Sequence, residues 1–441
     1  MASSAVANIK LNPWVVKVGD LKVGSTTVRD RLFGDSPLAS YYMLATATAL
    51  LSIVGLVMVW SSSIVTSITH DDSAYALFFQ QGRYALIGLG AMLLAIKTPI
   101  RTIKRLAVPA FIFAVVFQFL TFVPGIGRGE YGNYGWIYLP IIHNVQPAEF
   151  GKLALAVWLG KVLGNRQGDL GRIRYAVAPG LGAVGLLALI MGGKDLGTGL
   201  VILLLVFGAF FVAGTPTKLL TGVGAGAALM IAYFVVSSEN RRNRIISMFG
   251  TCDAQAECYQ ALHGRYALAS GGLFGVGLGG SREKWNYLPA AHNDFIFAII
   301  GEELGFFGTM LVLGLFLALG LAMARVVRRF TSDTFVQITT AAVASWIIGQ
   351  ALINIAVVVG SLPVIGLPLP LVSAGGSALI TTMAALGLVI NFARHEPGAP
   401  EALALQSDGL RESLPLLAKF SRKSANIRRL RRDVVPSRNH G

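Results

Sequence analysis

The chain has 441 residues, of which 54% are hydrophobic and 13% are charged, with 51 glycines and 2 cysteines. Soluble domains average about 25% charged residues, so this composition argues against a soluble enzyme and favours a surface covered by lipid. High apolar content excludes a disordered chain, aperiodic glycine excludes a collagen-like chain, and scarce cysteine excludes a disulfide scaffold. The formal net charge is +15, and in a membrane protein basic residues serve to fix the topology rather than to bind nucleic acid.

Ten apolar segments predict an all-α polytopic membrane protein with about ten transmembrane helices, because a spanning helix needs about 20 residues at a rise of about 1.5 Å each. The segments lie at 41–63, 75–96, 106–124, 146–163, 175–192, 196–214, 219–237, 294–323, 335–360 and 363–392. The second segment is the weakest, since Gln80, Gln81 and Arg83 interrupt it. The polar extension 1–40 lacks a cleavable signal pattern, so we expect the first span of the membrane domain 41–392 to act as its own insertion signal.

Lysine and arginine are divided unevenly between the two sides of this arrangement. With the N-terminus inside, the segments on that side carry 27 of them and the segments on the other side carry 9. The positive-inside rule therefore predicts that both termini are cytoplasmic and that the number of spans is even.

The longest connection, residues 238–293 between the seventh and eighth spans, is predicted on the outer side. It holds six glycines between 271 and 280, followed by Trp285, and aromatic residues beside an apolar run favour an ordered segment at the membrane interface. Both cysteines, Cys252 and Cys258, fall in this loop. An outward loop is oxidising, so the two cysteines form either a small disulfide-closed loop or two free thiols, and their spacing alone does not decide between these.

The tail 393–441 is predicted to be a disordered, basic, cytoplasmic segment. Pro397 and Pro400 end the last helix, and four arginines cluster between 428 and 432. Basic segments near a membrane attract anionic lipid at about 1 kcal/mol per residue, so we favour this role over the docking of an acidic partner.

Charged groups within spans are costly and therefore informative. In the sequence QPAEFGK, Gln146, Glu149 and Lys152 are spaced three apart and share one helical face, so Glu149 and Lys152 can pair. One interpretation is an ion pair that lets a polar helix end enter the membrane. The other is that Lys152 binds an anion inside a polar cavity.

A second polar set, KDLGT, stands at the N-terminal end of the sixth span and contains Asp195 and Thr198. Asp195 is well placed to cap that helix, and this role alone accounts for the residue.

In the predicted outer loop, several basic residues precede a carboxylate in the sequence. Arg241, Arg242, Arg244 and Lys284 precede Asp294, which lies at the mouth of the eighth span. Several basic groups suit a di-anionic ligand such as a pyrophosphate, beside a carboxylate that can accept a proton. Asn293 or Asp294 could also cap the helix, and for Asp294 the cap and base interpretations are compatible.

Glu302 and Glu303 lie deeper in the same span, about 12 Å along the helix, where two carboxylates need a polar interior and partners. The sequence has no His/Cys cluster with metal-ligand spacing, no GxxxxGK[ST] and no GxSxG motif. The sequence therefore identifies no certain cofactor, and it leaves a divalent cation open.

The segment KWNYLPAAHNDFIFAIIGEELG, residues 284–305, closely resembles the signature of the FtsW/RodA (SEDS) family of peptidoglycan glycosyltransferases. Four other segments resemble further elements of that family in the same order, between about residues 41 and 392: QPAEFGK, KDLGT, YALASGGLFGVGLGGSREK and INIAVVVGSLPVIGLPLPLVSAGGSA. The extension 1–40 and the basic tail fit the division branch, FtsW, better than the elongation branch, RodA.

The resemblance implies a ten-span enzyme of the bacterial cytoplasmic membrane that polymerises lipid II on the outer face and releases undecaprenyl pyrophosphate. Asp294 matches the family's essential carboxylate and would be the general base. The substrate-binding candidates are Lys152, Glu149, Arg241, Arg242, Arg244, Lys284, His292 and Ser377.

The partners implied are lipid II, the nascent glycan strand, a class B penicillin-binding protein, other division-septum proteins that could meet the basic tail, and membrane lipid, without nucleic acid. Two other classes compete, a flippase for lipid-linked precursors and a non-catalytic division scaffold. The charged residues from Arg241 to Asp294 gather on the outer face without an inverted internal repeat, which argues against a flippase. A scaffold leaves Asp294 unexplained.

Overall fold

The structure is a computed structural model. It describes residues 22–23, 26–27, 36–69, 75–130, 133–139, 143–165, 173–237, 239, 242–243, 245, 259–285, 287–289, 291–331 and 333–413.

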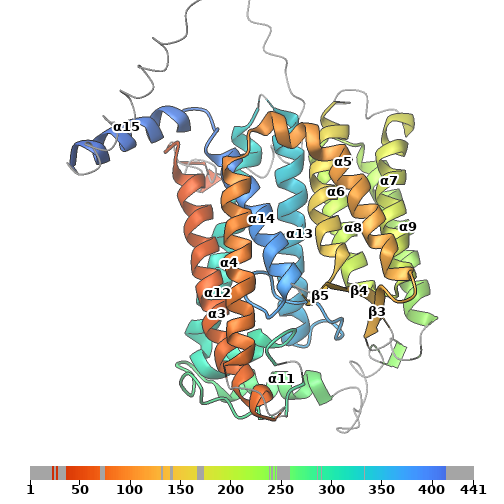
Figure 1. The fold of residues 1–441 in the computed structure, drawn as a ribbon, viewed down its shortest axis with the longest axis vertical. Coiled ribbons are helices and arrows are strands. Elements are labelled where there is room, and N and C mark those ends of the chain that lie inside the picture. Colours follow the sequence, from red (N-terminus) through yellow and green to blue (C-terminus); the bar gives the residue numbers. More distant parts are fainter. Residues whose placement is uncertain are drawn as a thin grey trace, which may run out of the picture.

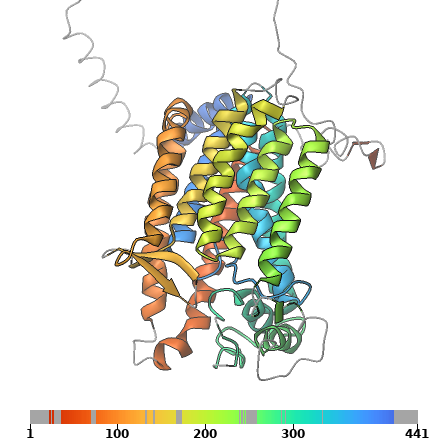
Figure 2. The ribbon, with the colours of Figure 1, turned by 90° about the vertical axis from the view of Figure 1, so that its right-hand side faces the viewer.

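Long helices run along a common axis (Figures 1 and 2). They are α3 (Ala39–Thr69), α4 (Ala76–Lys97), α5 (Ile100–Phe119), α6 (Pro147–Gly164), α7 (Ile173–Gly192), α8 (Leu196–Val212), α9 (Thr217–Val236), α12 (Ile296–Arg329), α13 (Thr334–Val358) and α14 (Gly376–Ala393). The shorter elements are β1 (Lys22–Val23), β2 (Thr26–Thr27), η2 (Leu120–Phe122), β3 (Gly127–Glu130), β4 (Asn133–Leu139), β5 (His143–Val145), α11 (Tyr259–Ser270) and α15 (Ala399–Ser413).

Six helices among the described residues are long and apolar enough to cross a membrane, namely α3, α5 with η2, α9, α12, α13 and α14. Helices α7 and α8 contribute shorter apolar stretches, Val177–Gly192 and Leu196–Val212. Helices α4 and α6 also coincide with predicted spans but carry polar groups, Gln80, Gln81 and Arg83 in α4 and the Glu149 pair in α6. The helical membrane character read from the sequence agrees with these elements.

The predicted last span, 363–392, is wrong in its first part. Helix α14 begins only at Gly376, and the preceding residues form an irregular segment. Pro363, Pro368 and Pro370 lack amide protons, and Gly366 has a φ of +77°, so this stretch cannot be helical.

An all-α chain is also incorrect, because strands β3, β4 and β5 form an antiparallel three-stranded sheet. Strand β4 contains Tyr134, Trp136, Ile137 and Tyr138, residue types that favour strands. The sheet leads directly into α6, and the amide of Tyr134 donates to the carbonyl of Gly193 at 2.8 Å. It therefore holds the turn between α7 and α8 close to the start of α6.

Helices α13 and α14 are the most buried of the candidate spans, whereas α9 lies at the periphery. The sheet and α11 lie at one end of the bundle, and α15 lies at the other (Figure 1). Helix α15 occupies part of the tail for which the sequence predicts disorder, and the tail beyond Ser413 lies outside the described residues.

Candidate active site

The buried ion pair of Glu149 and Lys152 forms at the start of α6. Gln146 occupies the position before the helix and Pro147 its first turn, where a missing amide proton costs nothing. The three-residue spacing brings Lys152 Nζ within 2.8 Å of Glu149 Oε1, and the two side chains are 1% and 3% exposed. The predicted pairing is confirmed.

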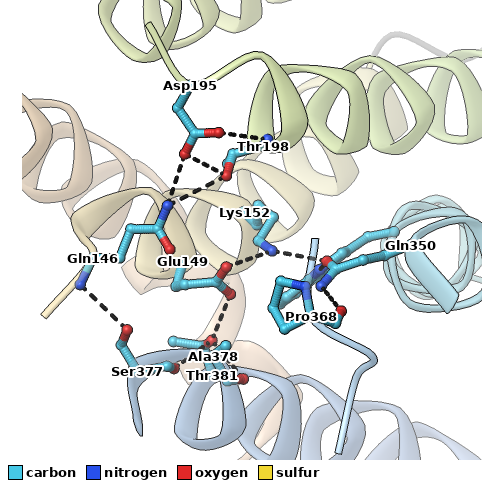
Figure 3. A network of polar contacts seen from close by, with 11 residues as sticks. Gln146, Glu149, Lys152, Asp195, Thr198, Gln350, Pro368, Ser377, Ala378 and Thr381 are labelled. Atoms are coloured by element: carbon cyan, nitrogen blue, oxygen red, sulfur yellow. Dashed lines mark hydrogen bonds and ion pairs between the residues drawn. The ribbon is translucent and has the colours of Figure 1, made fainter. Parts of the chain in front are cut away.

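Groups from α13 and α14 complete the environment of this pair (Figure 3). Lys152 Nζ donates to Gln350 Oε1 at 3.1 Å and lies 4.7 Å from the centre of the Trp346 ring. The hydroxyl of Thr381 lies 3.3 Å from Glu149 Oε2. The lysine charge is therefore balanced by a carboxylate, an amide oxygen and an aromatic face inside the bundle.

The second polar set joins the same network (Figure 3). Asp195 caps α8, as predicted, by accepting a hydrogen bond from the Thr198 amide at 2.9 Å. Gln146 donates its side-chain amide to Asp195 Oδ2 at 2.8 Å, and its backbone amide to Ser377 Oγ at 3.2 Å. Residues from three distant parts of the chain thus meet at the start of α6.

Asp294 lies just before α12. Phe295 takes the N-cap position, and its side chain makes no capping hydrogen bond. The N-cap position is therefore one or two residues later than the Asp294 or Asn293 that the sequence suggested. A Cβ built on Gly366 would lie 3.4 Å from Asp294 Oδ2, so the carboxylate lies against the backbone of the irregular segment before α14.

The backbone around Asp294 is held by hydrogen bonds from α13 and from this irregular segment. Asn354 Nδ2 donates to the carbonyl of Asp294 at 2.7 Å, and Ser373 Oγ donates to the carbonyl of Asn293 at 2.7 Å. The amide of Ala374 donates to the carbonyl of His292 at 3.0 Å. These carbonyls precede α12, and their engagement fixes the position of Asp294 relative to α13 and α14.

Glu302 and Glu303 find the partners that their depth requires, in the outer loop and in α3. Glu303 accepts from Lys284 Nζ at 2.9 Å and from Ser61 Oγ at 2.6 Å. Glu302 accepts from the Ser281 hydroxyl and from the Arg282 amide, the latter at 2.9 Å. Lys284, a predicted substrate ligand, is therefore buried in a separate ion pair.

The remaining predicted ligands are His292, Arg242, Arg241 and Arg244. Burial lowers the pKa of His292, which favours the neutral ring. Arg242 is exposed. Arg241, Arg244, Cys252 and Cys258 lie outside the described residues. Within the described part of the chain, no group of three or more His, Cys, Asp or Glu side chains could hold a metal ion.

Four residues of the network escaped the sequence interpretation: Trp346, Gln350, Asn354 and Thr381. Gln350 and Asn354 did carry a usable signal, because two amides one turn apart in an apolar span share a face and need polar partners. Trp346 and Thr381 carried none, since aromatic and hydroxyl side chains are common in any span.

Comparison with known proteins gives a consistent result. The model of the FtsW/RodA/SpoVE cell cycle proteins matches residues 41–397. A protein of Mycobacterium tuberculosis named "Probable peptidoglycan glycosyltransferase FtsW" is 39% identical over 84% of this chain and 71% of its own length. One of the same name from Geobacter sulfurreducens is 34% identical over 79% of this chain and 94% of its own length.

Solved structures are similar as well. A chain of a peptidoglycan synthase complex that coordinates polymerization and crosslinking has 27% identity and a TM-score of 0.66, over 80% of this chain and 98% of that chain. The rod shape determining protein RodA of Thermus thermophilus has 28% identity and a TM-score of 0.59, over 80% of this chain and 97% of that chain.

Proposed function

Because the chain belongs to the FtsW/RodA/SpoVE family of cell cycle proteins, we propose that it polymerises lipid II into glycan strands with Asp294 as the general base. The chain is a peptidoglycan glycosyltransferase, the activity for which its relatives at 34–39% identity are named. One observation supports Asp294 as the base: Asn354 of α13 binds the backbone carbonyl of Asp294. Gln350, one turn away on the same helix, binds Lys152, so the two charged residues belong to one connected site.

In the proposed reaction, the 4-hydroxyl of one sugar attacks the anomeric carbon of the second substrate. The Asp294 carboxylate takes the hydroxyl proton as the new glycosidic C–O bond forms. The bond between the anomeric carbon and the pyrophosphate oxygen breaks, and undecaprenyl pyrophosphate leaves with the electron pair. A positioned base contributes typically about 10²–10⁴-fold to such a step.

Positive charge is needed where the pyrophosphate departs. Lys152 is the proposed source inside the bundle, and Glu149 and Ser377 line the same network. The exposed Arg242, together with Arg241 and Arg244, is proposed to hold the pyrophosphate from the outer loop.

Lys284 and His292 have a different role in this proposal. Lys284 is committed to Glu303, and burial lowers the pKa of His292, which favours its neutral ring. Both are proposed to hold the segment before Asp294 in place. Lys152 is paired as closely as Lys284, and it is proposed as the cation because Gln350 and Asn354 link it to the backbone of Asp294.

We propose ten spans, the residues 238–293 on the outer face, and both termini in the cytoplasm of a bacterium, with the protein at the division septum. The division of lysine and arginine supports this topology, as does the location of α11 at the end of the bundle opposite α15 (Figure 1). A reporter fused after Gly441 and one inserted near Ala254 should then report opposite sides of the membrane. Signals from the same side would contradict the topology.

The partner proposed is a class B penicillin-binding protein that crosslinks the strands. The similar chain that belongs to a peptidoglycan synthase complex supports this proposal, because that complex couples polymerization with crosslinking. Other division proteins and anionic lipid are proposed to meet the basic tail.

The test of the proposed reaction is product formation by the purified protein in lipid vesicles supplied with lipid II. We expect a ladder of glycan strands on a gel in at least one of two conditions, with or without the transpeptidase partner. Transport of lipid II across the vesicle membrane without any strand formation, under both conditions, would contradict the proposal and favour a flippase.

A further inference from the structure

Two amide side chains, Gln350 and Asn354, stand one turn apart on one face of α13. Each donates to the irregular segment before α14, Gln350 Nε2 to the carbonyl of Pro368 at 2.8 Å and Asn354 Nδ2 to the carbonyl of Leu367 at 2.7 Å. Both side chains belong to residues that are only 2% exposed. Consecutive carbonyls of one segment are thus held by consecutive turns of one helix.

The orientation of each amide follows from its partners. Gln350 Oε1 faces Lys152 Nζ and Trp346 Nε1, both at 3.1 Å, and these groups can only donate. Its nitrogen must therefore point to Pro368. Asn354 Nδ2 faces two carbonyls, those of Leu367 and Asp294, which can only accept.

These contacts form one continuous chain between the two ends of the site. It runs from Lys152 through Gln350 to the carbonyl of Pro368, along one peptide to Leu367, and through Asn354 to the backbone of Asp294. Apart from that peptide, the links are four hydrogen bonds of 3.1 Å or less. The chain therefore ties Lys152 Nζ to the backbone of Asp294, and a shift of that backbone relative to Lys152 strains or breaks one of these bonds.

We propose that Gln350 and Asn354 are positioning residues, which set the distance between the base Asp294 and the cation Lys152 through the 366–374 segment. This inference rests on the proposed function, in which Asp294 accepts the proton of the attacking hydroxyl and Lys152 stabilises the departing pyrophosphate. A misplacement of about 1 Å in such a site can cost about 10²-fold in rate.

The same helix offers a matched control in Gln337. This buried amide also donates to a backbone carbonyl, that of Val327 at 2.9 Å. It stands 17 residues before Asn354, about 26 Å along the helix at a rise of about 1.5 Å per residue. Removing this bond perturbs α13 to a similar degree but leaves the chain from Lys152 to Asp294 intact.

The experiment compares Asn354→Leu, Asn354→Asp, Gln350→Glu, Gln337→Leu and Asp294→Asn as full-length protein in vesicles with lipid II. Asn354→Asp is nearly isosteric but replaces the donor by an acceptor facing two carbonyls. Gln350→Glu keeps an acceptor for Lys152 and Trp346 and removes the donor to Pro368. It also adds a carboxylate beside Lys152, so its hydrogen exchange, rather than its kcat, reports the link. These two variants carry the test even if Asn354→Leu does not fold.

Two measurements are made on each folded variant. The first is the split between kcat and KM for lipid II. The second is backbone hydrogen exchange over 291–295 and 366–374, which reports the link itself without reference to activity. For the Asn354 and Gln350 variants we expect kcat to fall about 10- to 100-fold with KM changed less than about threefold, and exchange to rise in both segments. For Gln337→Leu we expect kcat within about twofold of the parent.

The outcomes separate this inference from the proposed function. If Asp294→Asn is inactive while the Asn354 and Gln350 variants retain kcat within about twofold, the positioning role is overturned and the proposed base stands. If Gln337→Leu loses kcat as much as the Asn354 variants do, the effect is one of general packing and the inference is again overturned. If Asp294→Asn keeps the parental rate, the proposed base is wrong and the positioning role falls with it.

Discussion

Lys284 Nζ lies 2.9 Å from Glu303 Oε1, and both side chains are almost completely buried. The pair joins the outer loop to α12, and Ser61 extends it to α3. We therefore propose that the lysine of the KWNYLP motif holds the loop before Asp294 in place, where the sequence suggested a ligand for the substrate.

The ion pair of Lys284 and Glu303 should make a measurable contribution to the stability of the protein. Breaking a buried ion pair by removing one partner typically costs about 3–5 kcal/mol, because the other charge is left buried. We expect Lys284→Met to lower the melting temperature in detergent clearly. The double variant Lys284→Met/Glu303→Gln should recover much of the loss, since no charge is left uncompensated. Equal melting temperatures for the parent and Lys284→Met would show that the pair contributes nothing.

Helix α12 is interrupted at Gly305, which has φ 70° and ψ −163°, a backbone region almost restricted to glycine. The outer loop pairs with this break, since Val276 and Phe306 form backbone hydrogen bonds of 2.9 Å with Glu302 and Gly272. A Cβ at Gly305 would collide with the backbone of Gly275.

We therefore expect Gly305→Ala to destabilise the protein by at least about 1–3 kcal/mol through backbone strain alone. Gly314→Ala is the control on the same helix, because a Cβ there meets no atom within 4 Å. This control should be neutral or gain about 0.5–1 kcal/mol from helix propensity. Thermal unfolding of the two variants measures the difference. Similar melting temperatures for both would contradict the account of the break.

Lys152 is expected to be needed for turnover beyond its role in pairing. Loss of a group that stabilises developing negative charge costs about 10²–10³-fold in kcat, so Lys152→Met should lose activity to that extent. Lys152→Met/Glu149→Gln should regain stability without regaining activity. The control is Lys104→Met, which breaks a more exposed ion pair, that of Lys104 Nζ with Asp333 Oδ2 at 2.7 Å. This substitution should change the free energy of unfolding by at most about 1 kcal/mol. Near-parental polymerisation by the Lys152 variants, at matched melting temperature, would show that Lys152 has only a structural role.

The lowered pKa of His292 predicts a pH-dependent stability. Burial favours the neutral ring in the folded protein, while in the unfolded chain it titrates near pH 6.5. The unfolded chain therefore binds more protons as the pH falls through 6.5, and the free energy of unfolding decreases there. Between pH 7.5 and 5 the melting temperature of the parent should fall more than that of His292→Gln. Parallel curves would contradict the burial effect.

Local spacing predicted those parts of the site that depend on one helix turn. Glu149 and Lys152 lie three residues apart in one sequence motif and do pair, and Asp195 caps α8 through Thr198. The contacts that join these parts span 198 residues between Lys152 and Gln350 and 231 between Gln146 and Ser377, and no local pattern encodes them.

The errors in the fold have physical causes as well. Apolar run length alone does not distinguish a helix from the irregular 363–375 segment, although its three prolines were a local signal against a helix. Two of its carbonyls, those of Leu367 and Pro368, are bound by Asn354 and Gln350 of another helix. The sequence suggested Asn293 or Asp294 as the cap, whereas α12 has Phe295 at its N-cap position, and the carbonyls of residues 292–294 bind α13 and the 373–374 region.

The most direct test of the account is the polymerisation of lipid II by purified Asp294→Asn, beside Asp294→Glu and the parent. Asparagine keeps the size of the side chain, and Asp294 lies before the N-cap position of α12, so folding and melting should change little. The substitution removes the site that accepts the proton, so we expect a loss of about 10²–10⁴-fold in glycan product. Glutamate should retain only a small part of the activity, because one added methylene displaces the carboxylate by roughly 1 Å. Near-parental product from the folded asparagine variant would contradict the assignment of Asp294 as the general base.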